Sequence, residues 1–316
     1  MSGRIPAHFA ARPEARLGSV LVGGGHPVVV MGALNVSPES FYGGSVHRDA
    51  TALLRAATAM VEAGAAILDV GARSTAPYLD TVIDDLEETA RLTSAVELLA
   101  SKLGVPISAD TARPVPARAA LDAGAAIVND VTALRNVELA RLVAERGASL
   151  IVMASPARRE SMGHGDTPVA AIHALLGDTL TRARVAAIAE ERIVLDPGIG
   201  FFRDESIAWD AWDATVLAQL DALADLGRPL CVGVSRKSFL GAITGHRDPA
   251  ERLPASLAAT TVAVLRGASV IRTHDVAATV DAVRVAERLA AARAEGPDSF
   301  RARSVGGPSR APHVDD

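Results

Sequence analysis

Residues 106–129 read PISADTARPVPARAALDAGAAIVN, and this stretch contains one complete repeat of the fold. The apolar run 106–110 predicts a buried strand, 115–123 has the character of a helix, and Gly124 stands where a helix end often needs a positive φ. A second apolar run, 126–129, predicts the next strand. Strands this apolar are usually buried on both faces, and strands that alternate with helices form parallel sheets.

The same alternation continues along most of the chain. The predicted strands are eight in number and cover residues 28–35, 66–69, 106–110, 126–129, 149–153, 192–196, 229–235 and 270–274. The predicted helices cover residues 49–63, 80–102, 115–123, 137–146, 169–190, 206–226, 250–266 and 276–292. This repetition predicts an α/β fold, a closed (β/α)8 TIM barrel. We expect one barrel domain over 27–295, after an extended lead-in (1–26) and before a disordered tail (296–316).

The composition fits one enzyme-sized domain. The chain has 316 residues, of which 49% are hydrophobic, enough for the core of a single barrel. The formal charge of -5 and the aromatic content of 3% argue against nucleic-acid binding. No apolar run approaches the roughly 20 residues of a membrane span and no signal segment is evident, so we expect a cytoplasmic protein that does not bind membranes. The single cysteine, Cys231, excludes an intrachain disulfide.

Polar side chains stand where the predicted strands end, and in this fold those ends carry the chemistry. Asp110, Asn129 and Asp196 end three strands, and Lys237 follows a fourth. Two carboxylates, a carboxamide and an ammonium group suit a flat, nitrogen-rich heterocycle, because carboxylates accept from ring N–H groups while Lys and Asn satisfy a carbonyl. The alternative is that each Asp only caps the following helix. Four such groups together favour a ligand site.

A second polar set belongs to the first and last strands, which are neighbours in a closed barrel. Asn35, Arg272 and His274 form a plausible seat for a phosphate or diphosphate, with the guanidinium donating two hydrogen bonds. Ser235 and Ser238 can add hydroxyl donors. A buried, satisfied imidazole is the alternative for His274. The sequence has no spacing typical of a transition-metal site, whereas Mg²⁺ can enter with a diphosphate and needs only one or two protein oxygens.

Seven short motifs resemble those of dihydropteroate synthases and occur in the same order. They are 31–41 (MGALNVSPESF), 69–71 with 74–75 (DVG, ST), 109–111 (ADT), 128–131 (VNDV), 195–201 (LDPGIGF), 233–239 (GVSRKSF) and 272–276 (RTHDV). The resemblance spans about residues 28–276. It implies a barrel transferase that joins 6-hydroxymethyl-7,8-dihydropterin diphosphate to an aromatic amine and releases diphosphate, in folate or tetrahydromethanopterin biosynthesis.

The resemblance also implies roles for single residues. Asp110, Asp196 and Lys237 would be catalytic, and the pterin would be bound by Asp110, Asn129, Met153, Asp196 and Lys237. The diphosphate would be bound by Asn35, Arg272 and His274, with Asn35 also holding the Mg²⁺ cofactor. The amine would be bordered by Ser74, Thr75, Phe201 and Ser238. The implied partners are these two small-molecule substrates and, since such barrels often dimerise, a second copy of the chain.

The amine side departs from the bacterial folate-pathway pattern. Residues 73–77 read RSTAP where that pattern has Glu-Ser-Thr-Arg-Pro. A Met-Ala pair (153–154) replaces Met-His, and a Phe-Arg pair (202–203) replaces Gly-Lys. Residues 35–46 (NVSPESFYGGSV) look more like synthases of archaeal or tetrahydromethanopterin type.

These departures predict an amine bulkier and more anionic than p-aminobenzoate, such as an aminobenzene that carries a ribose phosphate. Ala76 opens space, and loops at the barrel mouth gain positive charge from Arg73, Arg158, Arg159 and Arg203. In the alternative, these arginines are solvated loop charges and p-aminobenzoate is the substrate.

Two other functions share the same barrel. A pterin-binding methyltransferase domain would use the Asp and Asn set but has no diphosphate to hold, which leaves Asn35, Arg272 and His274 unexplained. A non-catalytic pterin-binding paralogue would bind the pterin without turnover.

Overall fold

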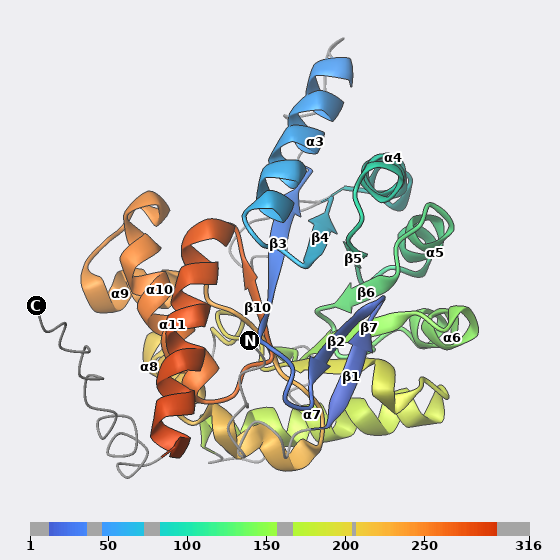
Figure 1. Ribbon diagram of the computed structural model, residues 1–316. Coiled ribbons are helices and arrows are strands. Elements are labelled where there is room, and N and C mark those ends of the chain that lie inside the picture. The colour runs from blue at the N-terminus through green and yellow to red at the C-terminus, as the bar shows by residue number, and fades with distance from the viewer. Residues whose placement is uncertain (1–12, 37–45, 73–82, 157–166, 204–206, 296–316) are drawn as a thin grey trace, which may run out of the picture.

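The computed structural model describes residues 13–36, 46–72, 83–156, 167–203 and 207–295. Its main sheet has eight strands in the order β8-β7-β6-β5-β4-β3-β10-β9, rolled into a barrel with the helices outside (Figure 1). The two end strands meet through one parallel bridge between Leu195 and Leu230, where the Leu195 N–H donates to the Pro229 carbonyl at 3.0 Å. The predicted (β/α)8 barrel is confirmed.

Every predicted strand is present in chain order, and all neighbours pair in parallel. The strands are β3 (Val29–Asn35), β4 (Ile67–Gly71), β5 (Ile107–Asp110), β6 (Ile127–Asp130), β7 (Ser149–Met153), β8 (Ile193–Asp196), β9 (Cys231–Gly233) and β10 (Val270–Thr273). The largest difference is β9, expected over 229–235. It ends early because Arg236 takes a left-handed φ of 53°, which turns the chain away from extended pairing.

The helices between the strands begin with ordinary capping chemistry. Asn136 Oδ1 accepts from the N–H groups of the first turn of α6, and Thr167 caps α7 just before a proline. The helices are α3 (Val46–Glu62), α4 (Asp85–Lys102), α5 (Pro114–Asp122), α6 (Val137–Arg146), α7 (Pro168–Val185), α8 (Trp209–Ala218), α9 (Ser238–Thr244), α10 (Leu253–Leu265) and α11 (Val276–Glu295).

Several predicted helices differ in extent, and one α-helix was not predicted. The helix expected over 80–102 begins at Asp85, after its N-cap Asp84. The segment 169–190 stops at Val185, because Ala187 has a φ of 61°. The segment 206–226 divides into α8 and the 3-10 helix η3 (Leu220–Leu226), and a 3-10 turn, η4 (Pro249–Arg252), precedes α10. The unpredicted helix is α9, which has only seven residues. A segment this short shows too little periodicity to predict from sequence.

The N-terminal part of the chain forms a hairpin instead of the extended lead-in expected over 1–26. Strands β1 (Glu14–Leu17) and β2 (Val20–Gly23) pair antiparallel. Leu17 and Val22 are fully buried against inward-facing barrel residues, including Met31 and Ile127. The hairpin therefore closes the end of the barrel where the strands begin, and the opposite end is left to bind ligands. The proposed tail, 296–316, lies outside the described residues.

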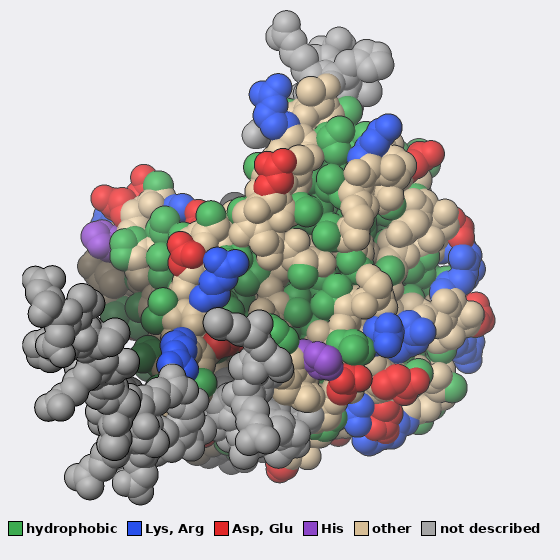
Figure 2. All heavy atoms as spheres, in the orientation of Figure 1, with side chains coloured by type: hydrophobic (Ala, Val, Ile, Leu, Met, Phe, Trp, Pro, Cys, Tyr) green, Lys and Arg blue, Asp and Glu red, His purple; other side chains and the backbone are tan. Residues whose placement is uncertain are grey.

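The surface of the described residues is mixed in charge. On the face drawn in Figure 2, basic and acidic side chains lie interspersed, in keeping with totals of 32 and 37 for the whole chain. Within the described ranges, no helix combines the length and the apolar character needed to traverse a bilayer.

Candidate active site

Four strand ends contribute to a buried polar cluster centred on Arg272. Its Nε lies 2.7 Å from Asp69 Oδ2, and its Nη2 lies 3.0 Å from Asp110 Oδ2. Asn129 Nδ2 donates to Asp69 Oδ2 at 3.1 Å. The structure thus brings together the predicted pterin residues Asp110 and Asn129, and it adds Asp69, which ends a predicted strand but was assigned no ligand.

The electrostatics of this cluster keep the guanidinium charged. Burial lowers the pKa of Arg272, but the carboxylates of Asp69 and Asp110 outweigh burial and raise it above its ordinary value. A carboxylate on each side of one guanidinium leaves a net negative charge at the base of the barrel mouth. Such a cluster suits a ligand with several N–H donors.

Asp110 and Asp196 do not cap the helices that follow their strands, so the capping alternative does not apply to them. The N-cap of α5 is Arg113, which makes no side-chain capping bond, and the N-cap of α8 is Ala208. Asp196 Oδ1 instead accepts from the Gly198 N–H at 2.7 Å, within the turn that follows β8. Asp110 and Asp196 are therefore available to the barrel mouth.

Asp196 and Lys237 form the other side of the mouth. Burial raises the pKa of Asp196, and the nearby Lys237 and Arg272 oppose that rise. Burial lowers the pKa of Lys237 to about 8, against the pull of the Asp196 carboxylate. Met153 is buried at the end of β7, in register with Asp196. These three predicted pterin residues thus line adjoining parts of the mouth.

The pterin and amine sides meet at a close contact. Lys237 Nζ lies 4.6 Å from the centre of the Phe201 ring. Gly200 has a φ of +90°, and a Cβ added there would lie 2.9 Å from Lys237 Cδ, so only glycine permits this approach. Phe201, predicted to border the amine, therefore lies beside Lys237, which is predicted to bind the pterin.

The rest of the described amine side involves Arg203. Its Nη2 donates to Ser238 Oγ at 2.6 Å, and its guanidinium carbon lies 4.2 Å from the centre of the Trp209 ring. Arg203 is thus fixed next to Ser238 instead of being a solvated loop charge. The remaining residues predicted for this side, Ser74 and Thr75, lie outside the described residues, as do Arg73, Ala76, Arg158 and Arg159.

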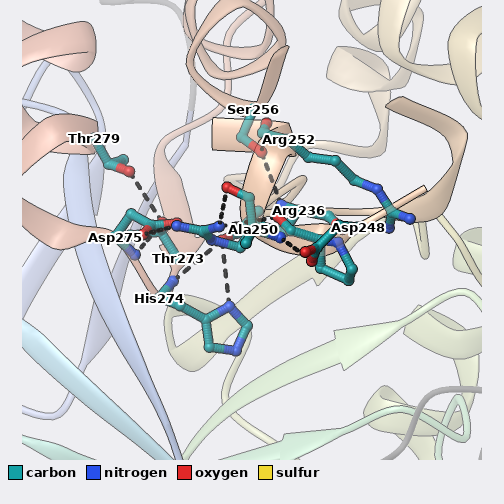
Figure 3. Close-up of polar contacts among 11 residues, drawn as sticks. Arg236, Asp248, Ala250, Arg252, Ser256, Thr273, His274, Asp275 and Thr279 are labelled. Atoms are coloured by element: carbon teal, nitrogen blue, oxygen red, sulfur yellow. Dashed lines mark hydrogen bonds and ion pairs between the residues drawn. The ribbon is translucent and has the colours of Figure 1, made fainter. Parts of the chain in front are cut away.

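Two loops at the mouth are locked together by Arg236 (Figure 3). Its Nε and Nη2 donate to the two carboxylate oxygens of Asp275 at 2.8 and 2.7 Å, and its Nη1 donates to the carbonyls of Pro249 and Ala250, each at 2.9 Å. Its backbone N–H donates to Ser256 Oγ at 2.8 Å. This network holds the loop that carries Lys237 against the loop after β10.

His274 projects away from that network in Figure 3. Its Nδ1 lies 3.2 Å from Ser235 Oγ, which also accepts from the His274 backbone N–H at 3.3 Å. A hydroxyl oxygen can accept two hydrogen bonds and donate one, so this contact is compatible with either tautomer of the ring. Partial burial and the nearby Arg272 lower the pKa of His274, so the ring is neutral at pH 7.

The predicted diphosphate set is arranged differently from expectation. Arg272 is paired with Asp69 and Asp110, so it connects the predicted diphosphate residues to the predicted pterin residues. Asn35 is exposed at the end of β3. Its carboxamide offers one oxygen, which fits a Mg²⁺ ion carried in by a diphosphate. In the parts of the chain that are described, no group of three or more His, Cys, Asp or Glu side chains is placed to hold a metal.

Asp213 on α8 is a second residue that the sequence pattern did not single out. It is fully buried, and its Oδ1 accepts from the Gly200 N–H at 2.8 Å. A signal was present, because Asp213 shares a helix face with Val216 and Leu217, which are apolar and buried. An acid on the apolar face of a helix indicates a specific partner.

Comparison with known proteins agrees with this geometry. Residues 31–274 match the family model for pterin binding enzymes. The dihydropteroate synthase of Escherichia coli (strain K12) is 36% identical over 271 residues, which cover 85% of this chain and 93% of that protein.

Solved structures give the same result. The dihydropteroate synthase of Xanthomonas albilineans with 4-aminobenzoic acid matches with a TM-score of 0.78 at 36% identity, over 88% of this chain and 98% of that one. In complex with 7,8-dihydropteroate, it matches with a TM-score of 0.75 at 35% identity, over the same shares. The resemblance drawn from the seven motifs is confirmed. The chain belongs to the pterin-binding enzyme family and, within it, to the dihydropteroate synthases, which are transferases.

Proposed function

We propose that the barrel mouth condenses 6-hydroxymethyl-7,8-dihydropterin diphosphate with an aromatic amine and releases diphosphate. The observation that carries this proposal is the placement of Lys237 Nζ over the Phe201 ring, near the partly buried carboxylate of Asp196. The predicted pterin site at Asp196 and Lys237 then adjoins the Phe201 ring, which would border the amine. The pterin methylene group and the amine can therefore meet at this boundary and form a bond.

The reaction breaks the bond between the pterin methylene carbon and the diphosphate oxygen, and the electron pair leaves with diphosphate. The methylene carbon develops positive charge, which the pterin ring shares. The carboxylates of Asp110 and Asp196 stabilise that charge, since preorganised groups act most strongly on charge that develops in the transition state. The neutral amine then attacks the carbon and loses a proton.

On the leaving-group side, His274 and Asn35 are the groups we expect to hold diphosphate. His274 can donate a hydrogen bond as a neutral ring, and the Asn35 carboxamide would coordinate Mg²⁺. When bound, Mg²⁺ supplies positive charge to the departing phosphate oxygens. Removal of Mg²⁺ with a chelator should therefore lower diphosphate release and spare the binding of the non-phosphorylated pterin.

We propose p-aminobenzoate as the amine, because the relatives are dihydropteroate synthases and one is solved with 4-aminobenzoic acid. The Arg203–Ser238 pair would receive its carboxylate. The same pair favours a second candidate, the ribose-phosphate aminobenzene of a tetrahydromethanopterin-type pathway. We also propose that the enzyme works in the cytoplasm as a homodimer. Apolar side chains exposed on α10 and α11, such as Val262 and Leu289, support the dimer.

The test is a turnover assay with pterin diphosphate, Mg²⁺ and each amine in turn. We expect diphosphate release only when an amine is present, with a kcat/KM preference for p-aminobenzoate of tenfold or more, about 1.4 kcal/mol. The reverse preference would select the ribose-phosphate amine. Pterin binding without release would identify a non-catalytic paralogue, and methyl transfer from a methyl-tetrahydropterin would identify the methyltransferase.

A further inference from the structure

A buried carboxylate lies behind the wall of the active site. Asp213 has an exposed fraction of 0%, and its Oδ1 accepts from the Gly200 N–H at 2.8 Å. Its Oδ2 has no hydrogen-bond partner among the described residues. Burying a carboxylate oxygen without a hydrogen-bond partner costs folding free energy. Such a group in a native protein therefore calls for a functional explanation.

The hydrogen bond from Gly200 connects Asp213 to both halves of the site. Gly200 lies in the turn closed by the Phe201 N–H, which donates to the Gly198 carbonyl at 3.1 Å. Gly200 also packs against the Lys237 side chain, whose Nζ lies over the Phe201 ring. A displacement of Gly200 would therefore change the distance between Lys237 Nζ and the Phe201 ring.

Helix α8 holds this turn at a second point. Trp212, the neighbour of Asp213, stacks on Phe202 with ring centres 5.4 Å apart and an interplanar angle of 22°. Both rings are buried. The stacking fixes the residue after Phe201, and the hydrogen bond fixes the residue before it. Asp213 is thus part of a rigid support and not an isolated buried charge.

Charged groups from several elements surround Asp213. Burial raises its pKa to about 6, while the Gly200 hydrogen bond, Lys237 and Arg203 oppose the rise and Asp210 on the same helix adds to it. Lys237 is influenced in turn by Asp196, Arg272, Asp213 and Arg203, and the carboxylate of Asp213 raises the pKa of Lys237. Above about pH 6, Asp213 is therefore a negative charge that favours the ammonium form of Lys237.

We propose that Asp213 is a positioning residue for the condensation: it fixes the Gly198–Phe201 turn through Gly200, and its carboxylate places a negative charge behind Lys237. The proposal rests on the proposed function. It extends the site to helix α8.

Two substitutions separate the hydrogen bond from the charge. Asp213→Asn keeps an oxygen for the Gly200 N–H and removes the charge, whereas Asp213→Ala removes both. Asp210→Asn is the matched control, because it removes a charge from the same helix without a bond to Gly200. The measurements are kcat and the KM of the amine across pH 6 to 9, as test conditions, together with the melting temperature.

For Asp213→Asn we expect unchanged folding and a Lys237 pKa lowered by about half a unit or more. The alkaline limb of kcat/KM then moves to lower pH by the same amount. For Asp213→Ala we expect, in addition, a higher KM for the amine and a kcat lowered by about tenfold. Asp210→Asn should leave the alkaline limb where it lies in the wild type; because Asp210 raises the pKa of Asp213, its removal changes the profile only near pH 6. An Asp213→Asn profile that also matches the wild type would overturn the role of the charge, and wild-type kinetics in a folded Asp213→Ala would overturn the role of the hydrogen bond.

A second readout separates this proposal from the proposed function. The Lys237 ammonium can be titrated by NMR after labelling the lysine side chains, which requires no turnover. If the Lys237 pKa is lower in Asp213→Asn but the wild type releases no diphosphate, the coupling between Asp213 and Lys237 is retained and the condensation is rejected. If the wild type turns over but the Lys237 pKa is the same in the variant, the condensation is retained and the coupling is rejected.

Discussion

At the mouth of the barrel, one guanidinium pairs with two carboxylates that come from different strands. Arg272 bonds to Asp69 and Asp110, while Asn129 bonds to the same oxygen of Asp69. The result is a site whose polar groups are already oriented before a ligand arrives. Preorganised groups of this kind need no rearrangement as charge develops, and this is the largest electrostatic advantage that an enzyme can have.

Asp110→Asn and Asp196→Asn should each reduce kcat by about 10²-fold or more, because each removes a charge next to the developing cation and keeps the side-chain shape. Folding should be retained in both variants. Steady-state kinetics and a thermal melt make the measurement. Kinetics equal to the wild type in both variants would remove these residues from the chemistry.

Arg272 and His274 should differ in what they bind. His274→Ala should weaken the pterin diphosphate by about tenfold and leave the hydroxymethyl pterin unchanged, since it loses one hydrogen bond to a charged group. Arg272→Ala should weaken both ligands and also lower the free energy of unfolding by about 3–5 kcal/mol, because Asp69 and Asp110 lose their shared buried partner. Isothermal titration with the two ligands, followed by urea unfolding, distinguishes the variants. Selective loss of diphosphate affinity in Arg272→Ala would contradict this reading.

At the scale of elements, the loops after β9 and β10 act as one unit. The bond to Asp275 raises the pKa of Arg236, and the bond to Arg236 lowers the pKa of Asp275, so this pair stays charged across the working range of pH. The pair also holds Arg236 in its left-handed conformation, which a non-glycine residue adopts only when its surroundings impose it.

A double-mutant cycle tests this unit. Arg236→Ala and Asp275→Ala should each lower kcat/KM, and the double variant should be little worse than either, giving a coupling energy of about 0.5–3 kcal/mol. Arg236→Lys should fail to restore activity, since an ammonium group cannot make the two parallel bonds to Asp275. Additive losses in the cycle would show that the two loops act independently.

The elements also show how far the sequence predicts this fold. The apolar runs in the sequence predicted all eight strands of the barrel. A strand that is buried on both faces is a nearly continuous run of apolar residues, and such a run is easy to recognise. The β1–β2 hairpin was not predicted, since its only buried apolar side chains are Ala15, Leu17 and Val22 and the segment is rich in glycine and proline. Strand-end positions identified Asp110 and Asp196. Asp213 could not be found this way, because its role depends on a backbone group 13 residues away in the chain.

At the scale of the whole molecule, the barrel is closed unequally. Strands β7 and β8 pair over four residues, whereas β8 and β9 are joined by the single Leu195–Leu230 bridge. This seam runs between the strand that ends in Asp196 and the strand that leads to Lys237. Two of the groups expected to hold the pterin therefore stand on the two edges of the least paired junction.

We expect the barrel to open locally at this seam before it opens elsewhere. We also expect a bound pterin to hold the two sides of the seam together. We expect the Leu195 amide to exchange with deuterium faster than the amides of β4 or β5 in the free protein, because local opening follows the weakest pairing. A pterin bound to both Asp196 and Lys237 should slow this exchange and raise the melting temperature. Exchange at Leu195 that is unaltered by a saturating pterin would mean that the ligand does not bridge the seam. If the pterin does bridge the seam, substrate binding completes the closure of the barrel. The ligand-free enzyme is then less rigid at this junction than the pterin-bound enzyme.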